Sequence, residues 1–133
     1  MTQSRIKKID CIMYYVPDLK EAAQFYEEVL GLNRVWTDNE EQMIGLVFPE
    51  SDSEIVLHTN TTFPNPDINF QVENVKEFCN YIHDEGYEIE LEPIDVRCGK
   101  FAIIKDPYGN RIPIIDLTKF DGVPRYDSSI PTW

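Results

Sequence analysis

The side chains best suited to covalent or metal chemistry are few in this chain, which has three cysteines and two histidines. Cys11, Cys79 and Cys98 are odd in number and show no C-x-x-C spacing, so a disulfide framework and a zinc knuckle are both disfavoured. We interpret them as small buried side chains or bystander thiols. The sequence also has no nucleophile beside a base, no phosphate-binding glycine loop and no dinucleotide-binding fingerprint.

The composition is that of a globular protein. At 133 residues, with 42% hydrophobic and 27% charged residues, the chain fits one domain or two small modules that share a core. No run of about 18 apolar residues occurs, and the basic N-terminus has no small-residue cleavage site. We therefore expect no transmembrane helix, no signal peptide and a cytoplasmic location. The net charge of −12 disfavours nucleic acid and anionic membranes as partners, favours solubility and is compatible with a cationic ligand.

An internal repeat organises the chain. Alternating apolar residues lead through Pro17-Asp18 into a helical pattern, and fifty-six residues later the same happens through Glu73-Asn74. Val16 matches Val72 in this repeat. A strand–helix unit that recurs once predicts a duplicated module. We predict a single domain over residues 1–133, with modules 6–60 and 66–118 and an irregular tail 119–133.

Each module is predicted to contain one helix followed by three strands. The two helices, each with its N-cap and its terminating glycine, are Leu19–Leu30 with Asp18 and Gly31, and Val75–Glu85 with Asn74 and Gly86. Phe25, Val29 and Leu30 belong to the apolar stripe predicted for the first helix. Strands are predicted to follow the helices over residues 34–38, 42–48 and 54–59, and over 88–92, 100–104 and 111–116.

Two segments resemble the glyoxalase/bleomycin-resistance/dioxygenase superfamily, also called vicinal oxygen chelate proteins. One is residues 9–19 together with Val29-Leu30-Gly31-Leu32, and the other, residues 105–112, is similar to that family's D-P-x-G hairpin before the last strand. The resemblance implies an α+β fold in which paired βαβββ modules form a cup-shaped, eight-stranded pair of half-barrels. It also implies a ligand on the concave wall and a homodimer.

Enzymes of this family usually carry metal ligands at four strand positions, which the resemblance maps onto Cys11, Val56, Asp67 and Pro113. Val56 and Pro113 cannot bind a metal through their side chains, and the two remaining residues are too few for a tight site. His58 is the one possible recruit, although it lies about 7 Å along the strand from Val56. We therefore predict no metal and no cofactor, with an unorthodox site of Cys11, His58 and Asp67 as the alternative.

Strand alternation indicates which side chains face the predicted cup. Ile68, Phe70 and Val72 are expected to pack under the helices, which turns the polar residues between them into the cup. There they form either a polar ligand-recognition wall or hydrogen bonds to neighbouring strands and trapped water. The predicted ligand-binding residues, Trp36 among them as a stacking platform, are Cys11, Met13, Tyr15, Trp36, Val56, His58, Asp67, Asn69, Gln71 and Pro113.

Three functions remain open at this stage. The first is a metal-free small-molecule-binding protein that sequesters a drug or metabolite, as the bleomycin-resistance branch does in antibiotic resistance. The second is a glyoxalase- or dioxygenase-like enzyme of lyase or isomerase type, cofactor-free or with a non-standard metal, in which Asp67, His58 or Tyr15 transfers protons. The third is a scaffold whose cup is filled by its own side chains.

Overall fold

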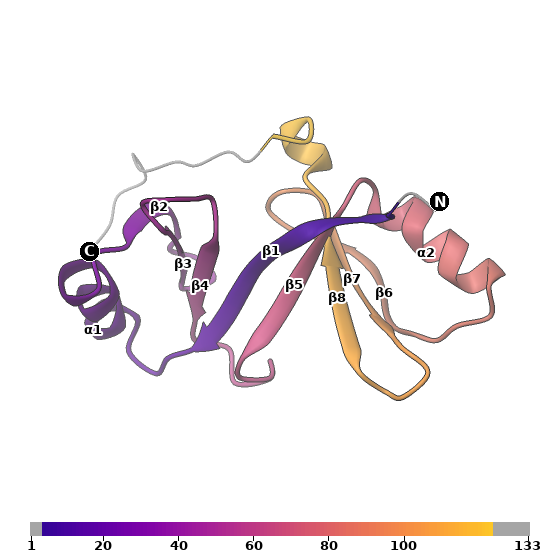
Figure 1. Cartoon of the computed structure of the whole chain (residues 1–133). Helices are drawn as coiled ribbons and strands as arrows, with labels where there is room; N and C mark the ends of the chain where they lie inside the picture. Colours follow the sequence, from indigo (N-terminus) through magenta and orange to yellow (C-terminus); the bar gives the residue numbers. More distant parts are fainter. Residues whose placement is uncertain (1–3, 124–133) are drawn as a thin grey trace. The chain divides into compact units, whose positions relative to one another are not determined.

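The structure is a computed structural model that describes residues 4–123. These residues form two compact units, a first unit of residues 11–67 and a second unit of residues 4–10 and 68–123 (Figure 1). The elements, in chain order, are β1 Ile6–Tyr15, α1 Leu19–Gln24, the π-helical turn η1 Phe25–Val29, β2 Asn33–Asp38, β3 Met43–Val47, β4 Glu54–His58, β5 Asp67–Val72, α2 Val75–Asp84, β6 Ile89–Asp95, β7 Lys100–Lys105, β8 Arg111–Ile115 and the 3-10 turn η2 Thr118–Phe120. The predicted α+β class with its repeated βαβββ order is confirmed.

The boundaries of the units differ from those of the sequence repeat. Residues 6–10 of β1 belong to the second unit, although the repeat assigns them to the first module. The segment predicted as an irregular tail starts within η2, and its residues 124–133 lie outside the described part of the chain. A single domain made of both modules stays a prediction. Among the described residues, no helix has the length and hydropathy needed to cross a membrane.

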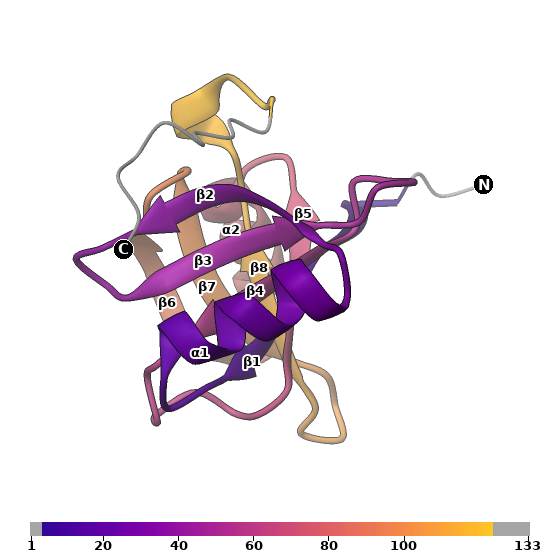
Figure 2. The same ribbon diagram turned by 90° about the vertical axis from the view of Figure 1, so that its left-hand side faces the viewer.

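In the first unit the strand order is β2-β3-β4-β1. β1 runs parallel to β4, whereas β2–β3 and β3–β4 are antiparallel pairs. α1 packs on one face of this sheet, and in Figure 2 it lies in front of β4. The buried residues of this core are Leu19, Ala23, Leu32, Ile44, Leu46 and Leu57. The strand periodicity of the sequence therefore places every second side chain of β3 and β4 beneath the helix.

The first helix begins and ends close to the predicted residues, with Gly31 after it at a φ of 81°, but its second half is a π turn. The carboxylate of Asp18 accepts a hydrogen bond from the backbone N–H of Glu21 at 3.0 Å, which caps α1. After residue 24 the helix widens, because the N–H of Leu30 donates to the carbonyl of Phe25, five residues back.

Within and after the wider turn, three side chains predicted to be buried point away from the core. Phe25, Val29 and Leu30 are 49%, 68% and 53% exposed, so their predicted place in the buried stripe is wrong. The apolar pattern of the sequence assumes 3.6 residues per turn, and a π turn breaks that period.

The second unit repeats the arrangement with the strand order β5-β8-β7-β6. Asn74 caps α2 by accepting from the N–H of Glu77 at 3.0 Å, and Gly86 follows the helix with a φ of 80°. α2 contacts β6 and β7, beside which it lies in Figure 1. Phe70 and Val72 pack in the core under α2, as predicted. Ile68 does not, since it is 39% exposed near the start of β5.

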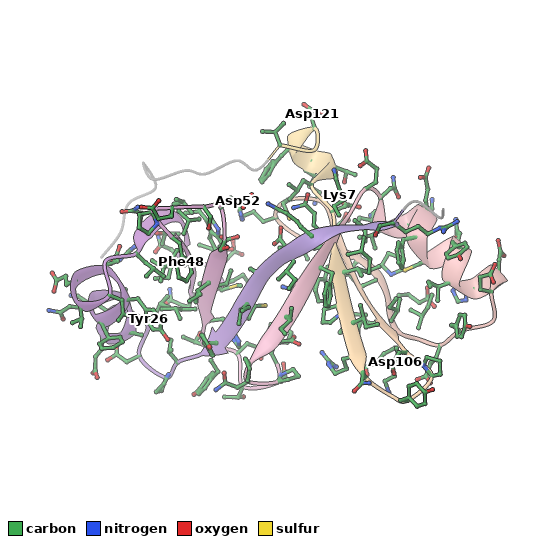
Figure 3. The ribbon with its side chains drawn as sticks, in the orientation of Figure 1. Lys7, Tyr26, Phe48, Asp52, Asp106 and Asp121 are labelled. Carbon is green, nitrogen blue, oxygen red and sulfur yellow. The ribbon has the colours of Figure 1, made fainter. Side chains whose placement is uncertain are left out.

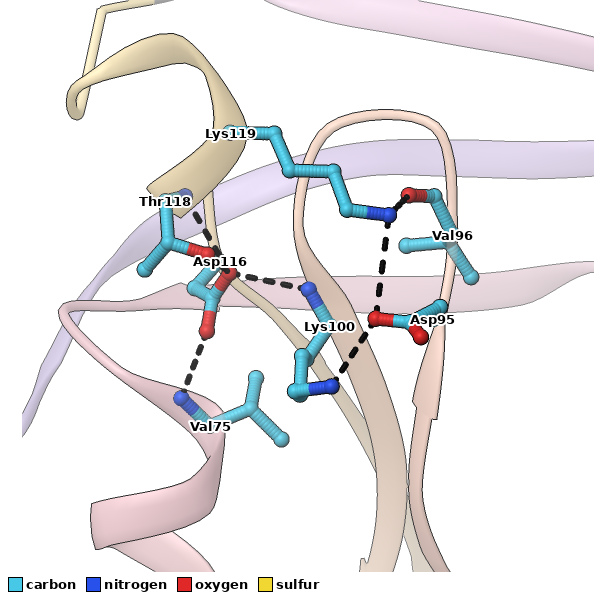
Figure 4. A network of polar contacts seen from close by, with 7 residues as sticks. All are labelled: Val75, Asp95, Val96, Lys100, Asp116, Thr118 and Lys119. Carbon is cyan, nitrogen blue, oxygen red and sulfur yellow. Dashed lines mark hydrogen bonds and ion pairs between the residues drawn. The ribbon is translucent and has the colours of Figure 1, made fainter.

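A buried carboxylate joins three elements of the second unit. Asp116, only 1% exposed, accepts from the backbone N–H groups of Val75 at 2.7 Å and Lys100 at 2.9 Å (Figure 4). It also accepts from the N–H and the hydroxyl of Thr118, at 3.2 and 2.8 Å. A Cβ at Gly99 would stand 2.0 Å from this carboxylate, so the glycine leaves room for it. One side chain thus fixes the start of α2 against the start of β7 and the end of β8.

Candidate functional site

The sheet of the first unit has a second face, opposite α1. Val56 pairs with Met13 and His58 with Tyr15 across the parallel strands β4 and β1. Because the intervening Leu57 packs under α1, these side chains project from the other side. We name this the helix-free face, made by Cys11, Met13, Tyr15, Trp36, Glu54, Val56 and His58. Strand alternation predicted this grouping except for Trp36, which was predicted separately as a stacking platform. A ligand on this face stays a prediction.

Trp36 forms the apolar part of the helix-free face. Its side chain is buried and packs with Cys11, Met13 and Val56. The indole Nε1–H donates to the carboxylate of Glu54 at 2.6 Å.

Both side chains meet above Gly45 of β3, where a Cβ would stand 2.0 Å from the Trp36 Nε1 and 2.5 Å from a Glu54 oxygen. The missing side chain at this position lets an aromatic ring cross the strand with a carboxylate fixed at its edge. Gly45 was not predicted to belong to the site, and Glu54, although alternation places it on this face, was not among the predicted ligand-binding residues. The signal for Gly45 was a glycine within a strand, which often marks a place where another group approaches the backbone closely. The signal for Glu54 was its position two residues before Val56, on the same face of the strand.

His58 is the polar centre of the helix-free face and is fully buried. Its Nδ1 accepts a hydrogen bond from the backbone N–H of Asn60 at 3.1 Å, which leaves the proton of a neutral ring on Nε2. That Nε2 has no hydrogen-bond partner among the described residues. The rings of Tyr15 and Phe63 flank it edge-on, with centroids 6.2 and 5.3 Å away.

The charge state of His58 follows from this environment. Burial lowers the pKa of the imidazole below its ordinary 6.5, and the negative charge of Asp67 opposes the shift only in part. His58 is therefore neutral near pH 7. Asp67 is itself buried, within the same unit. The three side chains predicted to transfer protons, Tyr15, His58 and Asp67, are all in the first unit, with His58 in ring contact with Tyr15 and within electrostatic reach of Asp67.

The remaining predicted site residues belong to the second unit. Asn69, Gln71 and Pro113 are buried, and they project from the face opposite α2 because Phe70 and Ile114 beside them pack under that helix. The Gln71 amide donates to the carboxylate of Asp10 at 3.0 Å. This bond agrees with the structural interpretation of the polar residues on β5, while a role in ligand recognition stays a prediction.

A hollow of about 220 Å³ lies on the second unit and is lined in part by Gln71, one of the predicted site residues. Glu73 also lines it, as do Lys7 of β1 and Asp121, just after η2. Lys7 and Asp121 are labelled in Figure 3. Lys7 and Glu73 form an ion pair of 3.0 Å across exposed surface. Such a pair is weak, so the hollow offers a ligand little fixed charge.

The sequence model of the Glyoxalase/Bleomycin resistance protein/Dioxygenase superfamily matches residues 8–114. The chain belongs to this superfamily. Its curated relative YraH of Bacillus subtilis (strain 168), an uncharacterized protein, is 29% identical over 122 residues, which span 80% of this chain and 95% of YraH.

Two solved structures show the same fold at low identity. Methylmalonyl-CoA epimerase of Mycobacterium tuberculosis is 18% identical, with a TM-score of 0.68 over 87% of this chain and 91% of the epimerase. The 2,3-dioxygenase LapB of Pseudomonas sp. KL28 is 16% identical, with a TM-score of 0.63 over 87% of this chain and 42% of LapB.

The four family positions that the resemblance identifies do not supply four metal donors. Two of the four positions that the resemblance identifies are Val56 and Pro113, whose side chains have no donor atom. Residues 4–123 also contain no group of three or more histidine, cysteine, aspartate or glutamate side chains placed to hold a metal ion. The alternative site of Cys11, His58 and Asp67 is therefore not assembled in this part of the chain.

Two of the cysteines are poorly suited to act as nucleophiles. Burial, with a smaller effect of the Glu92 carboxylate, raises the pKa of Cys79 to about 11. Burial, with a smaller effect of the Asp10 carboxylate, likewise raises the pKa of Cys98 to about 11. Both therefore remain protonated thiols near neutral pH. Their interpretation as small buried side chains agrees with exposures of 2% and 6%.

Proposed function

We propose that this superfamily member is a metal-free small-molecule-binding protein that sequesters a drug or metabolite and thereby confers resistance to it. The observation that carries the proposal is the Trp36–Glu54 pair above Gly45, which offers an aromatic platform with an oriented carboxylate beside the apolar side chains of Cys11, Met13 and Val56. A few fixed polar groups in apolar surroundings suit the recognition of a small molecule. The donor set at the four family positions supports binding without a metal.

A relative of the same fold supports the small-molecule class. The Streptomyces coelicolor methylmalonyl-CoA epimerase, 17% identical with a TM-score of 0.63, was solved in complex with 2-nitronate-propionyl-CoA. The proposal also includes a cytoplasmic location and, as the resemblance implies, a homodimer. The net charge of −12 supports a protein that binds neither nucleic acid nor anionic membranes.

One observation favours an enzyme as the second candidate. The neutral, buried His58 lies within electrostatic reach of Asp67 and against Tyr15, and such a group can move a proton. In that case the reaction would be a cofactor-free isomerisation or lyase step on the first unit. Turnover of a bound ligand distinguishes this candidate from sequestration.

Thermal-shift screening against antibiotics and aromatic metabolites tests the proposal, because a ligand that binds only the folded state raises the Tm. The chain has two tryptophans, so a Trp133→Phe variant makes Trp36 the only one that fluoresces. Ligands on the helix-free face should raise the Tm and also change this fluorescence. A broad panel without a hit contradicts the proposal, and so does stoichiometric zinc, nickel or iron in protein purified without chelator.

A further inference from the structure

The Nε2–H of His58 is a hydrogen-bond donor that the described residues leave without an acceptor. Burial of an unpaired polar group is costly, and native proteins nearly always satisfy such groups. The other ring nitrogen already accepts from Asn60, so rotation of the ring would only exchange one unsatisfied atom for another. A partner must therefore reach the Nε2–H, and that partner must be an acceptor.

The charges near His58 restrict which acceptor can bind its Nε2–H. Asp67 is close enough to His58 to act on it electrostatically, and Glu54 adds a second carboxylate to the same face. A carboxylate or phosphate on the ligand would be repelled by these groups, while a cation would meet the positive end of the N–H dipole. A neutral oxygen, such as that of a ketone or an amide, avoids both penalties.

The neighbouring rings indicate the shape of the ligand. Phe63 lies in the loop between β4 and β5, which has no regular secondary structure, and packs against the apolar cluster of Trp36. Its ring stands edge-on to His58 at a centroid distance of 5.3 Å. This is the one aromatic ring of the cluster that comes from a loop rather than a strand, among the residues described. A planar ligand could occupy this place once the Phe63 side chain moves out.

Building on the proposed function, we propose that the helix-free face binds a planar aromatic ligand with a neutral carbonyl oxygen. The ligand displaces the Phe63 ring, and its oxygen accepts the hydrogen bond from the Nε2–H of His58.

Matched naphthalene probes test this proposal by calorimetry or by Trp36 fluorescence in the Trp133→Phe background. 2-Acetylnaphthalene has the neutral acceptor, 2-ethylnaphthalene lacks it at nearly the same shape, and 2-naphthoate carries a charge. The ketone should bind about tenfold more tightly than the ethyl compound, the usual value of one buried hydrogen bond. It should also bind more tightly than the carboxylate.

Three variants assign the effect to the two side chains. His58→Asn keeps an acceptor near the Asn60 N–H but has no N–H at the position of the His58 Nε2. It should therefore abolish the preference for the ketone. His58→Gln keeps a donor at the distal position and should retain part of that preference. Phe63→Ala should raise the affinity for all probes about threefold or more, because no ring has to be displaced before binding.

The outcomes separate this inference from the proposed function. Equal affinity of the ketone and the ethyl compound, or an unchanged preference in His58→Asn, overturns the role of His58 while ligand binding stands. Failure of all probes to bind both wild type and Phe63→Ala overturns the inference, even where the broad panel yields other ligands. A broad panel without any hit contradicts the proposed function itself.

Discussion

The indole Nε1–H of Trp36 and the carboxylate of Glu54 lie 2.6 Å apart, directly above the Cα of Gly45. Trp36 lies in β2, Gly45 in β3 and Glu54 in β4. Because the central strand has a glycine here, the other two side chains can meet over it. The geometry of the helix-free face thus depends on a position that has no side chain.

A Gly45→Ala substitution should disrupt this arrangement. The new methyl group would lie 2.0 Å from the Trp36 Nε1, so the ring must move, and overpacking of this kind costs about 1–3 kcal/mol. Urea unfolding should show the loss, and the emission maximum of Trp36 in the Trp133→Phe background should shift. Glu54→Gln, which keeps an acceptor for the indole, is the control with a smaller effect. Unchanged stability and emission in Gly45→Ala would refute the arrangement.

Asp116 should be the most sensitive carboxylate of the second unit. Asp116→Asn replaces one accepting oxygen with an NH₂ group that faces backbone N–H donors, which should cost about 2–4 kcal/mol because hydrogen bonds to a charged group are strong. Asp95→Asn is the matched control, since it removes exposed ion pairs with Lys100 and Lys119 (Figure 4). Denaturation should show a far smaller change in the control, and equal losses would contradict the role of Asp116.

The lowered pKa of His58 makes stability depend on pH in a defined window. Well above pH 6.5 the ring is neutral in both folded and unfolded chains and contributes no pH dependence. As the pH falls below that value the unfolded chain takes up the proton first, so the free energy of unfolding decreases until the folded pKa is passed. Wild type should therefore lose more stability than His58→Asn between about pH 7.5 and about pH 5.5. Identical losses in the two proteins would exclude this linkage.

Leu30 and Leu32 test the π turn after α1. Leu30 is 53% exposed, whereas Leu32 is 8% exposed and packs in the core beneath α1. Leu32→Ala should cost about 2–3 kcal/mol, the lower part of the range for a buried leucine. Leu30→Ala should change the free energy of unfolding by less than about 0.5 kcal/mol. A continuous helix with Leu30 in its buried stripe would instead give a similar cost at both positions.

The sequence by itself determined the elements and their order. Alternation of apolar residues, the caps Asp18 and Asn74, and the glycines after both helices predicted the strands and helices to within a few residues. These signals are local, since each depends on residues within one or two turns or on one strand. The same alternation grouped Cys11, Met13, Val56 and His58 on one face, and the resemblance predicted the superfamily to which the chain belongs.

Only the tertiary structure decided how those elements present their side chains. The π turn exposes Val29 and Leu30 through a hydrogen bond between residues five apart, which no 3.6-residue period can predict. The Trp36 ring can lie over Gly45 because the pairing of β2, β3 and β4 places Trp36 and Val56 on either side of this glycine. The unpaired Nε2–H of His58 likewise depends on Asn60, Tyr15 and Phe63 all lying around one ring. The π turn is a change of helical period within one segment. The other two features arise from contacts between segments that a local pattern describes separately, and folding alone brings those segments together.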